Sequence, residues 1–479
     1  MTPEISDLRL AEDDSIKSAL VKIDKGALGV AFVVSNEEKL VGTITDGDVR
    51  RALLDGKTLD SSVGFIMQKA FVSLSIHSSD SDILAKLSQK IRVIPLTSDD
   101  GRLEDYATFG KLRRIPLASP NLEGNELAYV TDCIKSNWIS SQGKYVKEFE
   151  QRFGELHNGY YPLAVSNGTV ALHLALETIG VGKGDEVIVP DLTFAATINA
   201  VLYTGATPVI VDVDRESWNM VPEEVEKAIT NNTKAILPVH LYGLPCEMSK
   251  LLDISEKNGI HLIEDCAEAL GSKYNDQTVG TFGRASTFSF FGNKTITTGE
   301  GGMVLFRDEK DYERARRLRD HGMNPKKRYW HDEVGFNYRM TNLQAAIGLA
   351  QLERLDMFIS KKIALAKQYT EALAELEQIQ LPVELSGSKN TFWLFTIVLS
   401  GGMEKRDEAL RYFTANGIEA RPIFYPLHVM PPYEKYGIGK RYPNSNFISN
   451  NGISLPTHTF MDEETVAYIC QTVKRFIKK

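Results

Sequence analysis

The sequence predicts an α/β protein with a mostly parallel sheet, a smaller C-terminal α+β domain, and an α+β repeat before both. Two observations predict this organisation. Apolar strands and helices alternate along the middle of the chain, as in "DEVIVPD" followed by "FAATINAVLYTG", and strands joined by helical crossovers form parallel sheets covered on both faces. The N-terminal part instead carries a weak internal repeat, which predicts a separate module.

The N-terminal repeat aligns "LVGTITDGDVRR" with "LEDYATFGKLRR" at an offset of 108 − 45 = 63 residues. The alignment places Thr45 on Thr108, and the two arginines that end the first stretch on Arg113 and Arg114. Each unit is typical of a helix, a strand, a charged turn, and a second strand that leads into a helix. We therefore predict two β-α-β-β-α units within residues 1–112 that pack face to face.

From about Leu117 onward the pattern changes to that of a large α/β domain. An amphipathic helix, a glycine turn and a second helix come first, in "SPNLEGNELAYVTDCIKSNWISSQGKYVKEFEQRF". Five apolar runs then predict strands at 161–167, 185–191, 207–214, 234–241 and 261–267, with helices between them. Long helical material and the strand "TFWLFTIVL" follow. We place a large domain at 113–355 and a small C-terminal α+β domain at 356–479.

Composition and charge exclude several classes of function. A hydrophobic content of 43% with 25% charged residues is typical of globular proteins, and the net charge of −8 disfavours a nucleic-acid binder. The sequence contains no apolar stretch long enough for a membrane span and no signal-peptide pattern, so we expect a cytoplasmic protein without membrane contact. Its four cysteines lie far apart without a CxxC pair, which predicts reduced thiols and no metal site.

A lysine interrupts the apolar stretch "TFSFFGNKTITTGEGGMVLF" at Lys294. In α/β sheets, ligands bind beyond the carboxyl ends of the strands. Gly168 and Thr169 follow one predicted strand and can bind a phosphate, Phe194 lies beyond another, and Asp265 ends a third. An anion site, a flat aromatic, an acid and a lysine are the groups that hold pyridoxal 5′-phosphate (PLP), so we predict that cofactor.

The order of these motifs resembles the sugar-nucleotide aminotransferases, a family of PLP enzymes of fold type I with the aspartate-aminotransferase-like fold. The resemblance covers roughly residues 113–479, through "SNGTVALHLAL", "LIEDCAEALGS" and "GFNYRMTNLQAAIGLAQLE". It implies that Lys294 is the Schiff-base lysine, that Asp265 contacts the pyridine nitrogen, and that Phe194 stacks on the ring. It further implies phosphate contacts from Gly168, Thr169 and Ser289, a place near the ring hydroxyl for Glu268, and a contact from Asn337 to the phosphate of a neighbouring subunit. The protein would then be a homodimer or larger homo-oligomer with shared active sites.

Family members that carry histidine in place of the lysine perform dehydration, whereas Lys294 favours amino transfer. Glutamate is the expected amino donor and a ketosugar the acceptor. Burial would lower the pKa of such a lysine and suit it to carry a proton. A PLP-dependent sugar dehydratase and a non-catalytic nucleotide sensor are the alternatives from other classes.

The segments "GMNPKKRYWHDEVGFNYRMTN" and "GIEARPIFYPLHVMPPYEKYG" look like those of GDP-perosamine synthases, which aminate C4 of GDP-4-keto-6-deoxy-D-mannose. Basic, aromatic and histidine side chains suit a nucleotide sugar. The candidate substrate residues are Arg328, Tyr329, Trp330, His331, Arg421, Tyr425 and His428. A UDP-linked 4-keto-6-deoxy-hexosamine is the competing substrate, and a solvated or dimer-interface surface is the alternative role of these residues.

The N-terminal repeat resembles a tandem pair of cystathionine-β-synthase (CBS) domains, a family in which "GTITDGDVRRAL" matches a nucleotide-binding segment. The resemblance implies that Thr45 and Asp48 bind an adenine nucleotide. The second copy has Lys111 where the family has the aspartate, so at most one such site is expected. Regulation of the enzyme by that nucleotide is a further hypothesis, and the alternative to nucleotide binding is that the pair only packs or assembles the protein.

Overall fold

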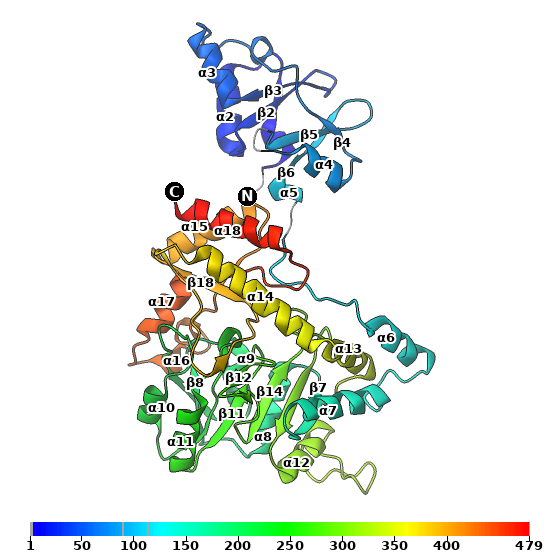
Figure 1. The fold of residues 1–479 in the computed structure, drawn as a ribbon, viewed down its shortest axis with the longest axis vertical. Helices are drawn as coiled ribbons and strands as arrows, with labels where there is room; N and C mark the ends of the chain where they lie inside the picture. The colour runs from blue at the N-terminus through cyan, green and yellow to red at the C-terminus, as the bar shows by residue number, and fades with distance from the viewer. Residues whose placement is uncertain (1–2, 89–90, 113–114, 479) are drawn as a thin grey trace. The chain divides into compact units, whose positions relative to one another are not determined.

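The computed structural model describes residues 3–88, 91–112 and 115–478. The chain divides into two compact units. The first extends to Ile115 and includes Arg411–Glu419, and the second holds Pro116–Leu410 and the residues from Ala420 onward (Figure 1). Arg113 and Arg114 of the predicted repeat lie outside the described residues. The proposed limits 1–112, 113–355 and 356–479 stay predictions.

The first unit contains two similar three-stranded sheets. In each sheet, the first strand pairs in parallel with the second, and the second pairs antiparallel with the third. The strands are β1 (Arg9–Ala11), β2 (Val30–Val34), β3 (Leu40–Thr45), β4 (Leu74–Ser75), β5 (Val93–Thr97) and β6 (Leu103–Thr108), with helices α1 (Ile5–Leu8), α2 (Ile16–Gly26), α3 (Asp46–Leu54), α4 (Asp80–Lys86) and α5 (Phe109–Leu112).

The predicted 63-residue repeat is confirmed by the register of these strands. Val30 pairs with Thr45 in the first sheet, and Val93 pairs with Thr108 in the second. The turns of the two copies also pair with each other, since the Leu40 N–H donates to the Gly101 carbonyl at 3.0 Å. The equivalent Leu103 N–H donates to the Glu38 carbonyl at 3.1 Å. The two copies therefore associate through equivalent positions.

The second unit is built around a seven-stranded sheet of order β7-β15-β14-β11-β10-β8-β9. Among the described strands of this sheet, β15 alone runs antiparallel to its neighbours. The bounds are β7 (Tyr161–Val165), β8 (Glu186–Pro190), β9 (Thr207–Val211), β10 (Thr233–Ile236), β11 (His261–Asp265), β14 (Ala285–Ser289) and β15 (Gly302–Phe306). The five predicted strands and the mostly parallel sheet are confirmed.

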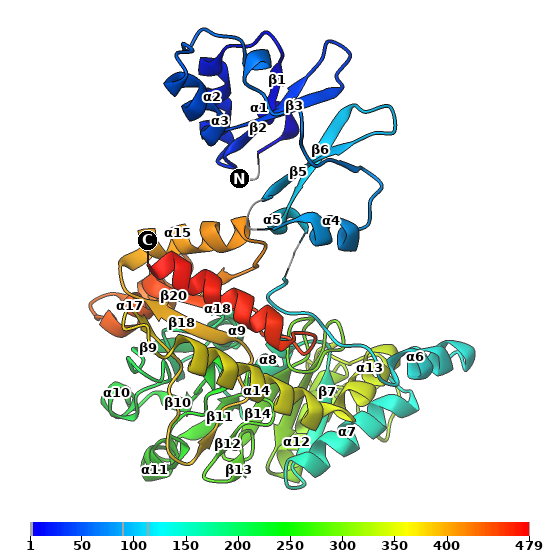
Figure 2. The ribbon, with the colours of Figure 1, turned by 45° about the horizontal axis from the view of Figure 1, so that its top comes forward.

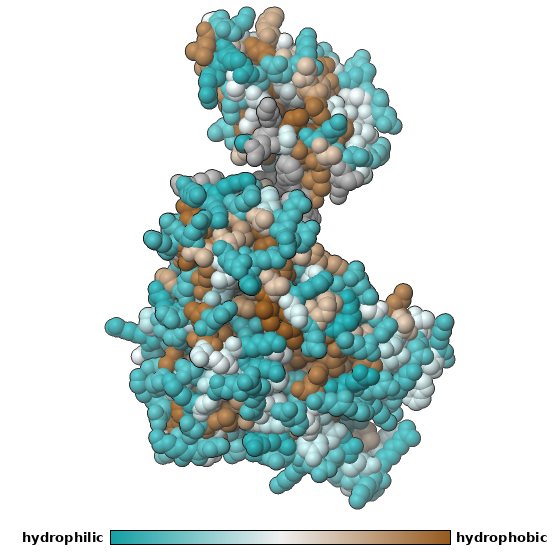
Figure 3. Space-filling view, viewed as in Figure 1, coloured by the Kyte–Doolittle hydropathy of each residue, from teal (hydrophilic) through white to brown (hydrophobic). Residues whose placement is uncertain are grey.

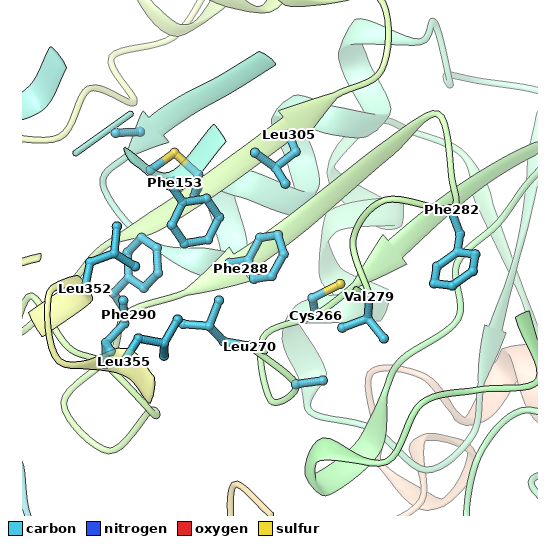
Figure 4. Packing of buried hydrophobic residues seen from close by; sticks show 14 of the residues in the cluster. Phe153, Cys266, Leu270, Val279, Phe282, Phe288, Phe290, Leu305, Leu352 and Leu355 are labelled. Atoms are coloured by element: carbon cyan, nitrogen blue, oxygen red, sulfur yellow. The ribbon is translucent and has the colours of Figure 1, made fainter. Parts of the chain in front are cut away.

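Helices cover both faces of this sheet, because alternate side chains of each buried strand point to opposite faces. One face packs against α8 (Gly168–Thr178), α9 (Ala195–Tyr203) and α12 (Glu309–Arg319). The other packs against α7 (Lys144–Leu156), α10 (Pro222–Ala228), α11 (Met248–Asn258) and α13 (Asn342–Leu352). Figure 4 shows Phe153 of α7 beside Phe288 and Phe290, with ring centroids 5.0 and 5.7 Å away. This packing fixes the end of β14.

The C-terminal part of the second unit contains a four-stranded antiparallel sheet of order β16-β18-β20-β19. Figure 2 shows α14 and α18 side by side against this region. The elements are α14 (Leu355–Leu373), β16 (Ile379–Gln380), β18 (Phe395–Leu399), α15 (Gly402–Ala415), β19 (Arg421–Pro422), α16 (Glu434–Gly437), α17 (Pro443–Asn451), β20 (Gly452–Leu455) and α18 (Glu463–Ile477). A small sheet joins β12 (Lys273–Tyr274), β13 (Gln277–Thr278) and β17 (Ser388–Lys389).

Two predictions from composition can also be compared with the structure. All four cysteines are buried and free, as predicted. Within the described residues, every helix is too short or too polar to cross a membrane.

Candidate active site

Lys294 lies in the loop between β14 and β15, five residues after β14 ends at Ser289. Its N–H donates to the Phe291 carbonyl at 2.9 Å, so the loop turns tightly at the lysine. Phe290, which is fully buried, precedes this turn. The apolar stretch therefore ends as a strand before the lysine, and the amine belongs to a loop at the carboxyl end of β14.

The Lys294 amine meets one carboxylate and one aromatic ring. Its Nζ lies 3.6 Å from Oε1 of Glu268 and 3.7 Å from the centroid of the Trp393 ring. Burial lowers the pKa of the Lys294 amine, and the carboxylates of Glu268 and Asp265 act in the opposite direction. Burial also raises the pKa of Glu268 to about 7, although Lys294 acts to lower it. Burial thus favours the neutral form of both groups, and the Glu268 carboxyl can exchange a proton near neutral pH.

Asp265 ends β11 and is buried, with 4% of its surface exposed. Its Oδ2 accepts from the Thr197 hydroxyl at 3.0 Å, and its Oδ1 accepts from the Ala267 N–H at 3.1 Å. Burial raises the pKa of Asp265, and these hydrogen bonds act to lower it. The carboxylate is thus held in a fixed orientation by residues of α9 and of the turn after β11.

Glu264, the neighbour of Asp265, has a structural role. Its carboxylate accepts from the N–H groups of Gly280, Phe282 and Gly283 at 2.7 to 2.9 Å. The remaining contact is to His240, whose Nε2 lies 3.2 Å away. Glu264, His240 and Cys266 form a buried group of the kind that can hold a metal ion. Protein donors already occupy the carboxylate, which indicates that Glu264 organises the turn before β14.

The predicted phosphate residues meet at the start of α8. A Cβ placed on Gly168 would lie 2.8 Å from the Cβ of Ser289, and one on Gly302 would lie 2.6 Å from the Asn167 carbonyl. Both glycines therefore allow backbones to approach where side chains would collide. Asn167 caps the helix, because its side chain accepts from the Val170 N–H. Gly168, the half-buried Thr169 and Ser289 thus surround the N-terminus of α8, where backbone N–H groups favour anions.

Phe194 precedes α9 and is 59% exposed. Its ring lies 5.9 Å from that of Phe424, which stacks on Tyr242 at 5.6 Å. Tyr242 in turn stacks on Trp393 at 5.7 Å. The rings of Phe194, Phe424, Tyr242 and Trp393 thus form a continuous row of aromatic contacts that ends at Lys294. Sequence analysis identified Phe194 at one end of this row and missed Tyr242 and Trp393.

Arg328, Tyr329, Trp330 and His331 belong to an exposed loop after α12. Lys327 lies over the Trp330 ring at 3.7 Å, and Arg328 lies over the Tyr329 ring at 4.9 Å. His331 Nδ1 donates to the His321 carbonyl at 2.9 Å. The aromatic side chains are well exposed, 75% for Tyr329 and 52% for Trp330. In the single chain, the contacts of these four side chains are to other residues of the loop or to His321, which follows α12 closely.

Arg421, Tyr425 and His428 come from the segment of β19 and the residues after it. Arg421 is exposed, and the Tyr425 ring is 47% exposed and faces the guanidinium of Arg406 at 5.6 Å. His428 instead lies against the protein, since its Nδ1 donates to Asp191 Oδ2 at 2.7 Å and its ring stacks on Tyr442. Asp191 directly follows β8. Like Asp265, it is a carboxylate at the end of a strand, and this position in the sequence could have indicated a site residue.

Asn337 is exposed, and its Oδ1 accepts from Arg339 Nε at 3.3 Å.

In the first unit, Thr45 and Asp48 form a capping box at the start of α3. Burial acts to raise the pKa of Asp48, but its hydrogen bonds lower the pKa below the ordinary value. The donors are the Thr45 N–H and hydroxyl, Arg51 and Gln68, at 2.6 to 2.9 Å.

Comparison with known proteins identifies the family. The model of the DegT/DnrJ/EryC1/StrS aminotransferase family matches residues 120–474. The chain belongs to this family. A CBS domain model matches residues 1–55, which lie within the first of the two units.

The chain is 48% identical over 366 residues to a GDP-perosamine synthase of Escherichia coli O157:H7, covering 76% of this chain and 99% of that protein. A GDP-perosamine synthase of Vibrio cholerae is 46% identical over 363 residues, covering 76% and 99%. Among solved structures, a putative sugar aminotransferase of Streptococcus pneumoniae in its PLP form has a TM-score of 0.73 at 29% identity, covering 76% of this chain and 99% of that one. These alignments use nearly the whole length of each relative, so about a quarter of this chain lies outside them.

The chain is therefore a PLP-dependent aminotransferase. The residues of the site suit this cofactor. The start of α8 offers an anion site beside Ser289 that a single added Cβ would obstruct. A buried carboxylate, Asp265, and a largely buried amine, Lys294, lie within the same unit, and burial shifts the pKa of each so that its neutral form is favoured.

Proposed function

We propose that this chain transfers an amino group from glutamate to C4 of GDP-4-keto-6-deoxy-D-mannose and so forms GDP-perosamine. The observation that carries this proposal is the 48% identity to a GDP-perosamine synthase over 99% of that protein's length. A GDP-perosamine synthase of Caulobacter vibrioides is 45% identical over 358 residues, which adds support from another relative. The alternative acceptor is a UDP-linked 4-keto-6-deoxy-hexosamine.

Each residue of the site has a proposed role. Bound PLP supplies the electron sink through which an amino group can be exchanged. Gly168, Thr169 and Ser289 bind the phosphate of the cofactor at the start of α8, where free backbone N–H groups favour an anion. Phe194 stacks on the ring, and Asp265 accepts a hydrogen bond from the protonated pyridine nitrogen.

Lys294 holds the cofactor through its Nζ and, once free, carries a proton at that atom. A lysine whose pKa burial has lowered is suited to this exchange, because burial makes its neutral form more accessible than that of an exposed lysine. Glu268 faces the same amine at 3.6 Å, and it would lie near the ring hydroxyl of bound PLP. A lysine here also favours amino transfer over the dehydration expected of a histidine.

The nucleotide sugar lies against the basic and aromatic loops. Arg328 and Arg421 neutralise its pyrophosphate, while Tyr329, Trp330 and Tyr425 pack against its base or hexose. His331 and His428 hydrogen-bond sugar hydroxyls. His428 is already oriented by Asp191, which accepts from its Nδ1 at 2.7 Å, and its Nε2 lies 3.4 Å from the Asn446 amide nitrogen. A sugar hydroxyl at Nε2 therefore takes the place of this long contact to Asn446.

The active enzyme is a homodimer or a larger homo-oligomer whose sites are shared. Asn337 is exposed, which leaves it accessible to the phosphate of a neighbouring subunit. Exposed apolar side chains on and beside α6 (Glu126–Lys135) include Leu127 at 79% and Ile134 at 60%. Figure 3 shows a hydrophilic surface interrupted by such apolar patches. Mixing Lys294→Ala chains with Asn337→Ala chains tests the proposal, since a shared site regains activity and an unshared one does not.

The CBS pair binds an adenine nucleotide at Thr45 and Asp48. Asp48 already accepts four hydrogen bonds. A ribose hydroxyl that donates to Asp48 therefore takes the place of the Arg51 or the Gln68 side chain. Calorimetric titration with an adenine nucleotide tests this contact: Asp48→Ala weakens binding, whereas unchanged affinity removes the contact. The cytoplasmic location and any regulation by the nucleotide stay predictions.

Mass analysis of the products tests the proposed reaction. Full-length enzyme is incubated with PLP, glutamate and GDP-4-keto-6-deoxymannose. The proposal predicts 2-oxoglutarate and a GDP-linked amino sugar in equal amounts. Loss of water from the sugar without an amino product would instead support the dehydratase.

A further inference from the structure

Trp393 contacts the Lys294 loop at two points. Its indole Nε1–H donates to the carbonyl of Asn293 at 2.8 Å, which is the residue directly before the lysine. The centroid of its ring lies 3.7 Å from Lys294 Nζ. One buried side chain, 4% exposed, therefore holds both the backbone that leads to the lysine and the amine that the lysine carries.

The Trp393 ring is itself fixed from several sides. The backbone N–H of Trp393 donates to the Tyr242 carbonyl at 3.1 Å, and the Tyr242 ring stacks on the indole with an interplanar angle of 15°. The Trp393 carbonyl accepts from the buried Lys362 amine at 3.0 Å, which also donates to the Thr457 carbonyl at 2.8 Å. A side chain held this way has little freedom to rotate away from Lys294.

Tyr242 links this ring to Glu268, the acid that also faces the amine. The Tyr242 N–H donates to Glu268 Oε2 at 2.9 Å, while Glu268 Oε1 faces Lys294 at 3.6 Å. The charged or titratable groups that act on the amine are the carboxylates of Glu268 and Asp265. The amine thus lies close to both a carboxylate and an aromatic face, and Tyr242 orients both.

The face of an aromatic ring carries negative potential and attracts a protonated amine. Burial alone favours the neutral amine, so the ring and the carboxylates keep the protonated form accessible. We propose that Trp393 is a positioning residue for amino transfer, which holds the free Lys294 amine against its indole face and fixes the point from which that amine takes up and returns a proton. This inference rests on the proposed role of Lys294.

Fluorination of tryptophan tests the proposal without changing the shape of the site. Full-length protein is produced with ordinary, monofluorinated, difluorinated or trifluorinated tryptophan, and the cofactor is removed. Lys294 is then labelled with an amine-selective reagent across a range of pH, and mass spectrometry of its peptide gives the pKa of the amine. Because fluorine weakens the negative face of the ring, the pKa should fall stepwise, by a total of about 0.5 to 1 unit.

The matched control is Trp393→Phe grown with the same fluorinated tryptophans. The proposal predicts that fluorination leaves the Lys294 pKa unchanged in this variant, because the other three tryptophans do not face the amine. A Lys294 pKa that stays constant in the parent protein would overturn the assignment, and so would an equal fall in Trp393→Phe. The labelling needs neither cofactor nor sugar, so its result is separate from the test of the proposed reaction.

Discussion

Gly168 and Ser289 approach so closely that a Cβ on Gly168 would lie 2.8 Å from the Cβ of Ser289. The two residues begin α8 and end β14, and together they line the proposed phosphate site. Gly168→Ala should weaken PLP binding at least about tenfold, because the methyl group displaces Ser289 and occupies the space at the helix N-terminus. Titration of the protein with PLP, followed by absorbance, measures this affinity.

Gly182→Ala is the matched control for this substitution. A Cβ there would meet only the Thr204 carbonyl, at 3.9 Å, an ordinary contact. PLP affinity should stay at the parent value in this variant. Equal affinities for Gly168→Ala and Gly182→Ala would contradict the proposed phosphate site.

Asp265→Asn should lower the rate of amino transfer by a factor of about 10² or more, because the amide cannot stabilise a proton on the pyridine nitrogen. Thr197→Val removes one hydrogen bond that orients Asp265 and should cost about tenfold. Steady-state kinetics with glutamate measure both losses. A rate for Asp265→Asn within a factor of about 2 of the parent rate would remove Asp265 from the reaction.

Lys362→Met should change how stability depends on pH. Burial lowers the pKa of Lys362 to about 7, from 10.5 in the unfolded chain. Between these values, the unfolded state binds more protons, so the free energy of unfolding of the parent rises with pH. The methionine variant lacks this rise, which amounts to about 2 kcal/mol between about pH 7.5 and about pH 9.

Urea unfolding at several pH values measures this difference. Lys361→Met is the matched control, because Lys361 is the exposed neighbour on the same helix. It should follow the pH profile of the parent. If Lys362→Met also follows the parent profile, then the buried amine keeps its ordinary pKa and the account of Lys362 is wrong.

Asp48→Ala should destabilise the first unit by about 1 to 3 kcal/mol, since the capping box is lost and Gln68 loses its acceptor. Asp46→Ala, at an exposed acidic position in the first turn of the same helix, should cost only about 0.3 to 1 kcal/mol. Thermal unfolding compares the two variants. Equal losses would show that the contacts of Asp48 do not stabilise the unit.

Local patterns in the sequence predicted much of this fold. The 63-residue offset recovered the register of two sheets, because each copy repeats the same local order of strands and turns. The parallel strands were predicted from apolar runs and helical crossovers, and Asp265 and Lys294 from their places after strands. These features depend on residues that are neighbours in the chain.

The contacts that sequence reasoning missed join distant segments. Trp393 and Lys294 are 393 − 294 = 99 residues apart, and "TFWLFTIVL" indicates only a buried strand. His428 and Asp191 are separated by 237 residues. A reading of periodicity and spacing in one sequence contains no information about which distant side chains meet, so these partners appear only in the folded chain.

The cofactor half-reaction shows which nucleotide sugar this enzyme aminates. The enzyme is converted to its amine form with glutamate, the donor is removed, and GDP-4-keto-6-deoxymannose or its UDP-hexosamine counterpart is added while the absorbance of the bound cofactor is followed. The absorbance of the aldehyde form should return with the GDP sugar and not with the UDP sugar. Return with the UDP sugar alone would contradict the assignment of the substrate, and no return with either would contradict amino transfer to a 4-ketosugar.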